Sequence, residues 1–238
     1  MKQYKYLIFD IDDTLLDFYS AFISAQEKVA AFLGIECSDE FKKTDEKCGW
    51  RAWKESGLEN TDTKDVQTHY HSYYYEYIRL HYKYLTEELG LAADTDEIVQ
   101  CYLNSIANSS VLKEPCTLAV YKELSTDYSM ILATNGIVQT QKKRVSDFLP
   151  YTDKVYISEE MGVIKPTEEY FDYILHDLNC SPEQCLMIGD SITNDIIGAK
   201  KSGMNVCFYN PKHKEVSGNI SCDFEIHSLA ELKEILQK

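Results

Sequence analysis

Five short runs of apolar residues along the chain predict buried strands. They are Tyr6–Ile11, Met130–Thr134, Val155–Ser158, Cys185–Gly189 and Val206–Tyr209. Each run is too short for a typical helix and ends in small or polar residues, and helical patterns lie between most of them. Apolar strands that alternate with helices are typical of a parallel sheet covered by helices on both faces. A weaker run, Asp223–His227, predicts a sixth strand ahead of a final helix near Leu229–Leu236.

The interval between the first two strands departs from this alternation. A crossover between parallel strands needs only about a dozen residues, but more than a hundred separate Asp12 from Met130. Four segments of this interval have helical patterns: Tyr19–Leu33, Glu40–Glu55, Thr63–Leu89 and Asp94–Asn108. We therefore expect an α/β core with a Rossmann-like parallel sheet, residues 1–17 and 111–238, into which an all-helical cap domain, residues 18–110, is inserted.

Polar residues follow the predicted strands at their carboxyl ends. The carboxyl ends of parallel strands meet at one edge of an open sheet, and ligands bind beyond that edge. We therefore expect these residues to converge, although isolated aspartates more often cap helices or lie on the surface. The residues are Asp10 and Asp12 after the first strand, Thr134, Asn135 and Gly136 after the second, Lys165 in the loop after the third, and Asp190 and Asp195 after the fourth.

This set of side chains predicts phosphoryl transfer. Carboxylates gathered in one site repel each other unless a cation lies among them, and the oxygen atoms of Asp10 and Asp190 suit Mg²⁺. Asp10 would attack phosphorus and form an aspartyl-phosphate. Asp12 would protonate the departing oxygen and later deprotonate the attacking water.

We expect the phosphate to be bound by donors at the end of the second strand and by a lysine in the loop after the third strand. The Thr134 hydroxyl and the backbone N–H groups of Asn135 and Gly136 would donate to phosphoryl oxygens, and Lys165 would supply a fixed positive charge.

These motifs resemble those of the haloacid dehalogenase-like (HAD) hydrolase superfamily, and they occur in that family's order. They are Asp10-Ile11-Asp12-Asp13-Thr14-Leu15, Thr134-Asn135-Gly136, Lys165-Pro166, and Gly189-Asp190-Ser191 with Asp195. The resemblance implies Asp10 as nucleophile and Asp12 as acid and base. It also implies Mg²⁺ bound by Asp10, the Asp12 carbonyl and Asp190, with Asp195 in the next layer around the ion. Dehalogenation is disfavoured, because it does not need the proton transfer that Asp12 provides.

A second resemblance concerns the substrate. The stretch Ile157–Pro166, followed by Phe171-Asp172-Tyr173, is similar to the pyrimidine 5′-nucleotidase subgroup of that superfamily, which implies hydrolysis of nucleoside monophosphates. A sugar-phosphate phosphatase or a phosphoglucomutase-like enzyme of the same fold is the alternative. A non-catalytic binding protein is a further one, although such proteins usually lose the nucleophile or the acid. Phe18 and Tyr19, just past the first motif, are the expected substrate contacts of the cap.

The aromatic segment Tyr70–Tyr84 admits two interpretations. Its tyrosines at 70, 73, 74, 77 and 84 largely follow three- and four-residue spacing, which favours a packing stripe inside the cap. Stacking of one of them on a base is the alternative. His69 and His71 do not predict a metal site, because residues two apart on a helix face different directions.

Charge and composition limit the classes of molecule that the protein is expected to bind. With 24 Lys and Arg against 39 Asp and Glu, the formal net charge is −15, which disfavours nucleic-acid polymers and anionic membranes and leaves a small phosphorylated metabolite. No apolar run approaches the ~20 residues that span a bilayer, and the N-terminus has no signal-peptide pattern. We expect a cytoplasmic protein with eight reduced cysteines, either a monomer or a small homo-oligomer.

Overall fold

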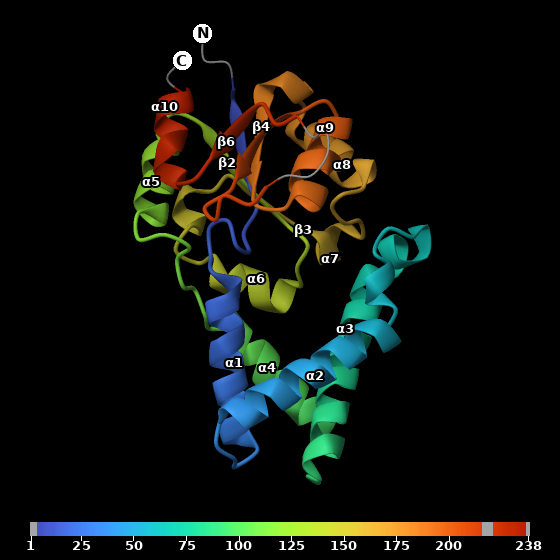
Figure 1. Cartoon of the computed structure of the whole chain (residues 1–238). Coiled ribbons are helices and arrows are strands. Elements are labelled where there is room, and N and C mark those ends of the chain that lie inside the picture. The colour runs from blue at the N-terminus through green and yellow to red at the C-terminus, as the bar shows by residue number, and fades with distance from the viewer. Residues whose placement is uncertain (1–3, 216–220, 237–238) are drawn as a thin grey trace. The chain divides into compact units, whose positions relative to one another are not determined.

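The core is built on one parallel sheet. The computed structural model describes residues 4–215 and 221–236, and within them six strands lie in the order β3-β2-β1-β4-β5-β6, every neighbouring pair parallel (Figure 1). The strands are β1 Tyr6–Phe9, β2 Ser129–Thr134, β3 Lys154–Ile157, β4 Cys185–Gly189, β5 Asn205–Tyr209 and β6 Phe224–Ile226. The predicted Rossmann-like sheet is confirmed. Two strands are shorter than predicted. Strand β1 ends at Phe9 rather than Ile11, because the chain turns away from the sheet after Asp10, and β6 spans Phe224–Ile226 rather than Asp223–His227.

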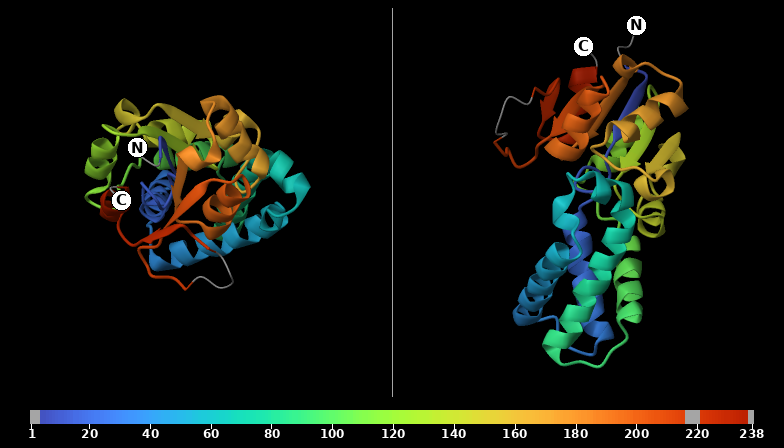
Figure 2. Two further views of the ribbon diagram at one scale, coloured as in Figure 1. Left: turned by 90° about the horizontal axis from the view of Figure 1, so that it is seen from above. Right: turned by 90° about the vertical axis from the view of Figure 1, so that its right-hand side faces the viewer.

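Alternate residues of each strand enter two separate hydrophobic cores. Leu7 and Phe9 of β1 pack with residues of α5 (Thr117–Leu124) and α10 (Leu232–Leu236), whereas Ile8 packs with residues of α8 (Glu168–Leu178) and α9 (Gly198–Lys201). Figures 1 and 2 show the sheet between these two helical layers. Each large side chain buried in this way contributes about 1.5–3 kcal/mol, so the continuous apolar runs of the sequence are explained by burial on both faces.

The strand order changes direction beside β1. The chain leaves β1 towards β2 and β3 on one side and later returns to β4, β5 and β6 on the other. Such a change of direction beside the first strand is where open α/β sheets bind ligands. The residues that follow β1, β2 and β4 all lie at this edge.

The inserted segment is helical throughout most of its length. Its helices are α1 Phe18–Phe32, α2 Asp39–Glu55, α3 Lys64–Leu89 and α4 Thr95–Ala107, each within one residue of its predicted bounds, and Figure 2 shows them bundled together. Side-chain oxygens of Ser38, Thr63 and Asp94 cap the N-termini of α2, α3 and α4. Gly90 ends α3 in the left-handed conformation, with φ 65°.

The chain forms two compact units. The α/β unit comprises Met1–Phe18, Ser110–Val138 and Val145–Lys238, and the helical unit comprises Tyr19–Ser109 and Gln139–Arg144. The latter segment is most of α6 (Val138–Arg144). It therefore belongs with the helices, whereas the sequence assigned it to the core. The domain bounds drawn from the sequence stay a prediction.

The tyrosine-rich segment forms part of the packing inside the helical unit. The Tyr70 ring stacks on Tyr74 with centroids 6.1 Å apart, and Tyr82 is fully buried. His69 lies beside Asp65, with Nδ1 3.2 Å from the carboxylate. The predicted packing stripe and its alternative, stacking of one of these tyrosines on a base, both stay predictions.

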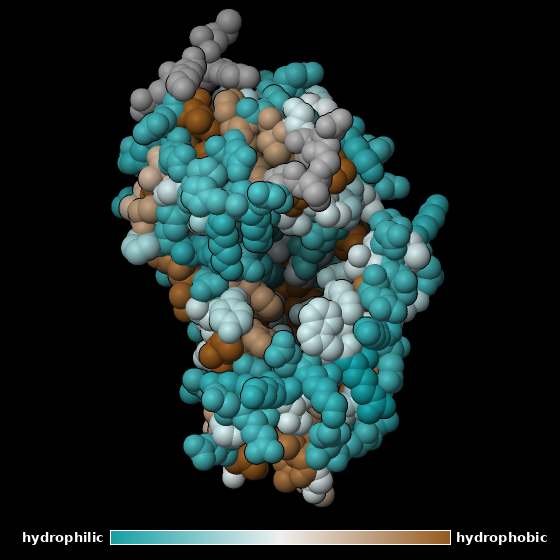
Figure 3. Space-filling model, in the orientation of Figure 1, coloured by the Kyte–Doolittle hydropathy of each residue, from teal (hydrophilic) through white to brown (hydrophobic). Residues whose placement is uncertain are grey.

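Hydrophilic residues cover much of the visible surface. The face shown in Figure 3 is largely hydrophilic. Across the described ranges, no helix combines the length and the apolar character that a membrane crossing requires. All eight cysteines are free thiols.

Candidate active site

The centre of the site is a buried lysine between two carboxylates. Asp10 directly follows β1, and its backbone N–H donates to the Ile188 carbonyl on β4 at 2.9 Å. Lys165 Nζ lies 2.6 Å from Asp10 Oδ1, 2.7 Å from Asp195 Oδ1 and 3.1 Å from the Ala133 carbonyl. An ammonium group has three hydrogens, so these three acceptors satisfy it completely.

Burial and charge oppose each other in this cluster. Burial alone would lower the pKa of Lys165, but the charges of Asp10 and Asp195 outweigh it and raise that pKa. Lys165 therefore stays cationic. Burial also raises the pKa of Asp10 well above its usual range; Lys165 works against this, while Asp195 and Asp190 add to it. One ammonium thus faces an excess of carboxylates.

Asn135 holds the backbone of Lys165 in place. Its Oδ1 accepts from the Lys165 N–H at 2.7 Å, and its Nδ2 donates to the Lys165 carbonyl at 2.6 Å. The side chain thus joins the end of β2 to the loop after β3. The sequence predicts that Asn135 contacts the phosphate. Because its side chain bonds to the Lys165 backbone, its backbone N–H is the group suited to that contact. The clamp itself was missed, because no sequence signal connects two positions thirty residues apart.

The Asp195 carboxylate lies so close to the end of β4 that only glycine fits at position 189. It lies in a π-helical segment, Ile192–Ile197, and its Oδ2 accepts from the Ser191 N–H at 3.0 Å. A Cβ atom on Gly189 would lie 2.2 Å from that same Oδ2. Strand β4 therefore ends in glycine because a carboxylate occupies the space of a side chain.

Three carboxylates provide the donor set of a divalent cation site. Oxygen atoms of Asp10, Asp190 and Asp195 lie within 4.8 Å of one another. Burial raises the pKa of Asp190 to about 6, and the charges of Asp195 and Asp13 add to the effect, against Lys214 and Lys165. These are the oxygen ligands that hard divalent cations prefer, and their excess of negative charge is what such an ion would neutralise. The residues present therefore fit the predicted metal.

Other predicted residues lie at the same edge of the sheet. Asp12 lies in the turn after β1, where its backbone pairs with Leu16. Thr134 is the last residue of β2 and is buried. The Gly136 carbonyl accepts from the Ser158 hydroxyl at 3.3 Å. The sequence thus identified positions that the fold brings together, and their individual chemical roles stay predictions.

Two neighbours of the first motif have structural contacts. Asp13 has a left-handed backbone, with φ 64°, and its carboxylate accepts from Lys113 Nζ at 2.7 Å. Thr14 Oγ1 accepts from the Asp190 N–H at 3.1 Å, a contact that sequence reasoning missed although Thr14 belongs to the motif. Tyr19 is 67% exposed and lies in the helical unit, so its predicted substrate contact remains untested, as does that of Phe18.

Comparison with known proteins agrees with this geometry. Residues 4–203 match the model of the haloacid dehalogenase-like hydrolase family. The chain is 31% identical to the HAD-hydrolase YfnB of Bacillus subtilis, over 99% of this chain and 97% of that protein. It is 28% identical to the pyrimidine 5′-nucleotidase PynA of Streptococcus pneumoniae, over 99% and 96%. It is 26% identical to the glyceraldehyde 3-phosphate phosphatase of Pyrococcus furiosus, over 100% and 95%.

A solved structure extends the similarity to three dimensions. The crystal structure of YfnB bound to magnesium superposes on this chain with a TM-score of 0.82 at 30% identity, and the match covers 100% of both chains. The family model, the full-length relatives and the solved structure all indicate the same family. The cluster of carboxylates around Lys165 at the end of the sheet is consistent with that family. The chain therefore belongs to the haloacid dehalogenase-like hydrolase family.

Proposed function

We propose that the protein is a magnesium-dependent phosphomonoester hydrolase that acts through an aspartyl-phosphate on Asp10, with pyrimidine nucleoside 5′-monophosphates as its preferred substrates. The observation that carries the proposal is the contact between Lys165 Nζ and Asp10 Oδ1 at 2.6 Å. Because Oδ1 is bonded to the lysine, Oδ2 is the oxygen available to attack phosphorus. A fixed ammonium beside the reacting centre then stabilises the charge of the transferring phosphoryl group.

The proposed reaction has two steps. In the first, Asp10 Oδ2 forms a bond to phosphorus, the ester P–O bond breaks, and the departing oxygen takes a proton from Asp12. In the second, water attacks phosphorus while Asp12 accepts its proton, and the P–O bond to Asp10 breaks. Inorganic phosphate leaves, and both carboxyl groups return to their starting states. The Thr134 hydroxyl and the N–H groups of Asn135 and Gly136 would hold the phosphoryl oxygens.

Magnesium would be held by Asp10, the Asp12 carbonyl and Asp190, with Asp195 in the next layer around the ion. When bound, the ion supplies positive charge that neutralises phosphate oxygens. Asp195 then has a second task, because it also bonds Lys165 at 2.7 Å. It orients the ammonium towards Asp10.

The choice of substrate rests on the relatives. A full-length similarity to a pyrimidine 5′-nucleotidase, together with the subgroup-like stretch Ile157–Pro166, supports nucleoside monophosphates. The similarity to a glyceraldehyde 3-phosphate phosphatase supports a sugar-phosphate phosphatase as the second candidate.

A panel of phosphate esters separates the two candidates. Release of inorganic phosphate is measured with Mg²⁺ for UMP, CMP, AMP, GMP, ribose 5-phosphate and glyceraldehyde 3-phosphate. We expect the highest kcat/KM for UMP or CMP. Turnover of a sugar phosphate that equals or exceeds that of every nucleotide would exclude the nucleotidase. A phosphoglucomutase-like reaction would instead yield an isomer of the sugar phosphate without free phosphate.

A further inference from the structure

Two cysteines of the α/β unit lie side by side. Cys180 follows the end of α8, Cys185 is the first residue of β4, and their sulfur atoms are 3.5 Å apart. At this distance the two atoms are in direct contact, so no other group separates them. The sulfurs of a disulfide are about 2.05 Å apart, so an approach of about 1.5 Å would join them.

The segment between the two cysteines has a fixed conformation. It forms a short 3₁₀ turn, Pro182–Gln184, which leads directly into β4. The Ser181 N–H donates to the Gln184 side chain at 3.1 Å, and the proline fixes one backbone angle of the turn. Because the folded chain already holds Cys180 and Cys185 together, a bond between them requires no further closure of a loop.

The two thiols differ in their surroundings. Cys180 is partly exposed, whereas Cys185 is fully buried. Contact with Tyr6 and, to a smaller extent, the charge of Cys180 raise the pKa of Lys5, so a cation lies near the Cys180 sulfur. Partial exposure beside a cation is the setting in which cysteines react with oxidants. Burial raises the pKa of the Cys185 thiol, and the neighbouring Cys180 adds to the effect, so Cys185 is the less reactive of the two.

We propose that Cys180 and Cys185 are a modification site that a hydroperoxide converts into a reversible disulfide. With hydrogen peroxide, the Cys180 sulfur attacks one peroxide oxygen, the O–O bond breaks, and water leaves as Cys180 becomes a sulfenic acid. The Cys185 sulfur then attacks the Cys180 sulfur, the S–S bond forms and the S–O bond breaks. The hydroxide leaves as a second water with the proton of Cys185. The two thiols lose two electrons in total, and these reduce the peroxide.

This modification is separate from the proposed reaction. Cys185 begins β4, whereas Asp190 follows the other end of that strand. The disulfide would tie the end of α8 to the start of the strand and leave the carboxylate cluster unchanged. The inference does not rest on the proposed function, and no step of its test uses phosphate release.

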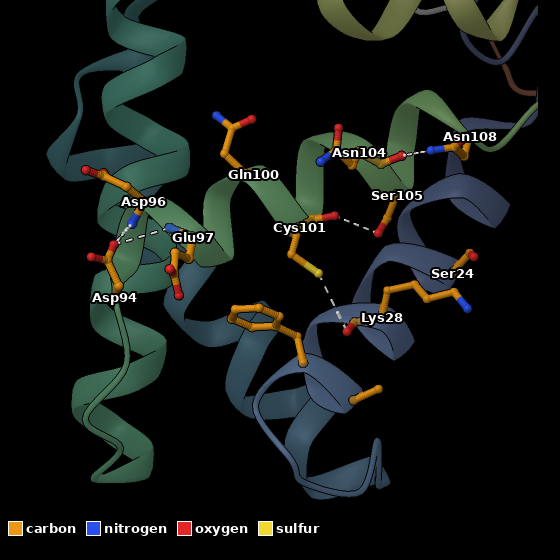
Figure 4. A pocket seen from close by; sticks show the side chains of 12 residues that line it. Ser24, Lys28, Asp94, Asp96, Glu97, Gln100, Cys101, Asn104, Ser105 and Asn108 are labelled. Atoms are coloured by element: carbon orange, nitrogen blue, oxygen red, sulfur yellow. Dashed lines mark hydrogen bonds between the residues drawn. The ribbon is translucent and has the colours of Figure 1, made fainter.

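Cys101 of α4 provides the matched control. It is partly exposed, as Cys180 is, and it lies in a groove between α1 and α4. Figure 4 shows its thiol directed at the Lys28 carbonyl, 3.7 Å away. A backbone carbonyl cannot form a disulfide, so peroxide should leave Cys101 without a disulfide partner.

The test follows the thiols of the full chain after treatment with hydrogen peroxide. Remaining thiols are alkylated with iodoacetamide in urea, and the unreduced protein is digested with a protease that cleaves after glutamate. Cleavage after Glu183 places Cys180 and Cys185 on different peptides, which stay joined only through a disulfide. We expect the joined peptides, an alkylated Cys101, and recovery of both thiols with dithiothreitol.

Two variants separate the steps of the reaction. In Cys185→Ala the sulfenic acid on Cys180 has no partner, and its labelling by dimedone should rise about tenfold or more, because the intramolecular attack is lost. In Cys180→Ser the buried Cys185 should remain a thiol that is alkylated in urea. Cys101→Ser should form the disulfide as the unaltered protein does. Urea denaturation confirms that each variant is folded before it is oxidised.

Three results would overturn the proposal. The first is alkylation of both Cys180 and Cys185 after peroxide treatment. The second is a disulfide between Cys207 and Cys222 while Cys180 and Cys185 stay reduced; these cysteines also interact, since the charge of Cys222 adds to the effect of burial in raising the pKa of Cys207. The third is equal dimedone labelling of Cys180 in Cys185→Ala and in the unaltered protein.

Discussion

The contacts of Asp10 separate what this residue does for the fold from the nucleophilic role proposed for it. Its Oδ1 accepts from Lys165, and its backbone N–H continues the bonding between β1 and β4. An asparagine at this position would keep an oxygen acceptor for the lysine, and only the nucleophilic carboxylate would be lost. The two contributions can therefore be separated by one substitution.

We predict that Asp10→Asn lowers kcat by on the order of 10⁴-fold or more, because a carboxamide does not form the covalent intermediate. The free energy of unfolding should change by less than about 2 kcal/mol. Phosphate release and urea denaturation measure the two effects. Asp172→Asn, at an exposed position of α8, is the matched control and should keep full activity. Activity of Asp10→Asn within tenfold of the unaltered protein would refute the covalent mechanism.

Asn135 leads to a second prediction at this scale. Asn135→Ala removes both hydrogen bonds to the Lys165 backbone, so the ammonium loses its fixed position relative to Asp10. Misplacement of a catalytic group by about 1 Å can cost on the order of 10²-fold, and we expect a fall of that order in kcat with a smaller change in KM. Asn108→Ala, which removes an exposed asparagine bond in the helical unit, should leave kcat unchanged. Equal kinetics of the two variants would show that the clamp has no role in positioning.

At the scale of elements, the strands were predictable because burial on both faces leaves continuous apolar runs. The helices of the insert were predictable because their capping residues and glycines mark both ends. The site was predictable only in part. Asp10, Lys165 and Asp190 follow strands and so share an edge, but the Asn135 clamp and the contact between Gly189 and Asp195 depend on distances that no periodicity encodes. The grouping of α6 with the helical unit could not be predicted from the sequence either, because α6 directly follows β2 of the core.

The end of β4 gives a prediction for the element that carries Asp190 and Asp195. In Gly189→Ala the new methyl group overlaps Asp195, so the π-helical segment must shift. Overpacking of this kind costs about 1–3 kcal/mol, and we also expect loss of most activity because Asp195 bonds Lys165.

Gly90→Ala is the comparison for this substitution. Its φ of 65° is strained for alanine, yet a Cβ there meets nothing within 4 Å. It should cost about 1–2 kcal/mol with normal activity per folded molecule. Urea denaturation and phosphate release, measured on both variants, test the difference. Full activity in Gly189→Ala would contradict the role given to Asp195.

The Glu114 carboxylate bonds both to the end of β5 and to the segment Ser228–Leu229. Its carboxylate accepts from the Tyr209 hydroxyl at the end of β5 at 2.7 Å, the Ser228 hydroxyl at 2.6 Å and the Leu229 N–H at 3.0 Å. Burial alone would raise the pKa of Glu114, but hydrogen bonds from Ser228, Tyr209 and Leu229 outweigh it and lower the pKa. The ionised carboxylate is therefore the form that stabilises the fold.

A pKa that is lower in the folded state means stability that is complete above the unfolded value, 4.5, and lost as the pH falls through the folded value. We predict that Glu114→Gln lowers the free energy of unfolding by about 1–2 kcal/mol at pH 7, and that this difference shrinks below pH 4.5. Glu123→Gln breaks an ion pair with Lys233 in which Glu123 is 61% exposed, and should cost less than about 1 kcal/mol. Urea denaturation at several pH values tests both predictions. If the difference in the free energy of unfolding between Glu114→Gln and the unaltered protein grows as the pH falls, the pKa of Glu114 is not lowered by folding.

At the scale of the whole molecule, the acidity of the surface and that of the site act together. A chain with a formal charge of −15 repels phosphate esters at a distance. Its site also contains more carboxylates than the single ammonium of Lys165 can balance. A divalent cation bound there would neutralise the excess negative charge of the site, and it would relieve repulsion that opposes folding.

We predict that Mg²⁺ stabilises the protein through this cluster. A ligand that binds only the folded state at 100 times its Kd contributes about 2.7 kcal/mol, which for a chain of this size raises Tm by roughly 5–10 °C. Asp190→Asn should raise the stability of the metal-free protein, because it removes one of the three neighbouring carboxylates, and it should abolish most of the Mg²⁺ shift. Asp172→Asn changes the net charge equally but lies on an exposed face, so it should keep the shift. Thermal unfolding of the three proteins with and without Mg²⁺ distinguishes binding at the cluster from general screening of an acidic surface: equal shifts in both variants would assign the stabilisation to screening and leave the carboxylate cluster without a bound ion.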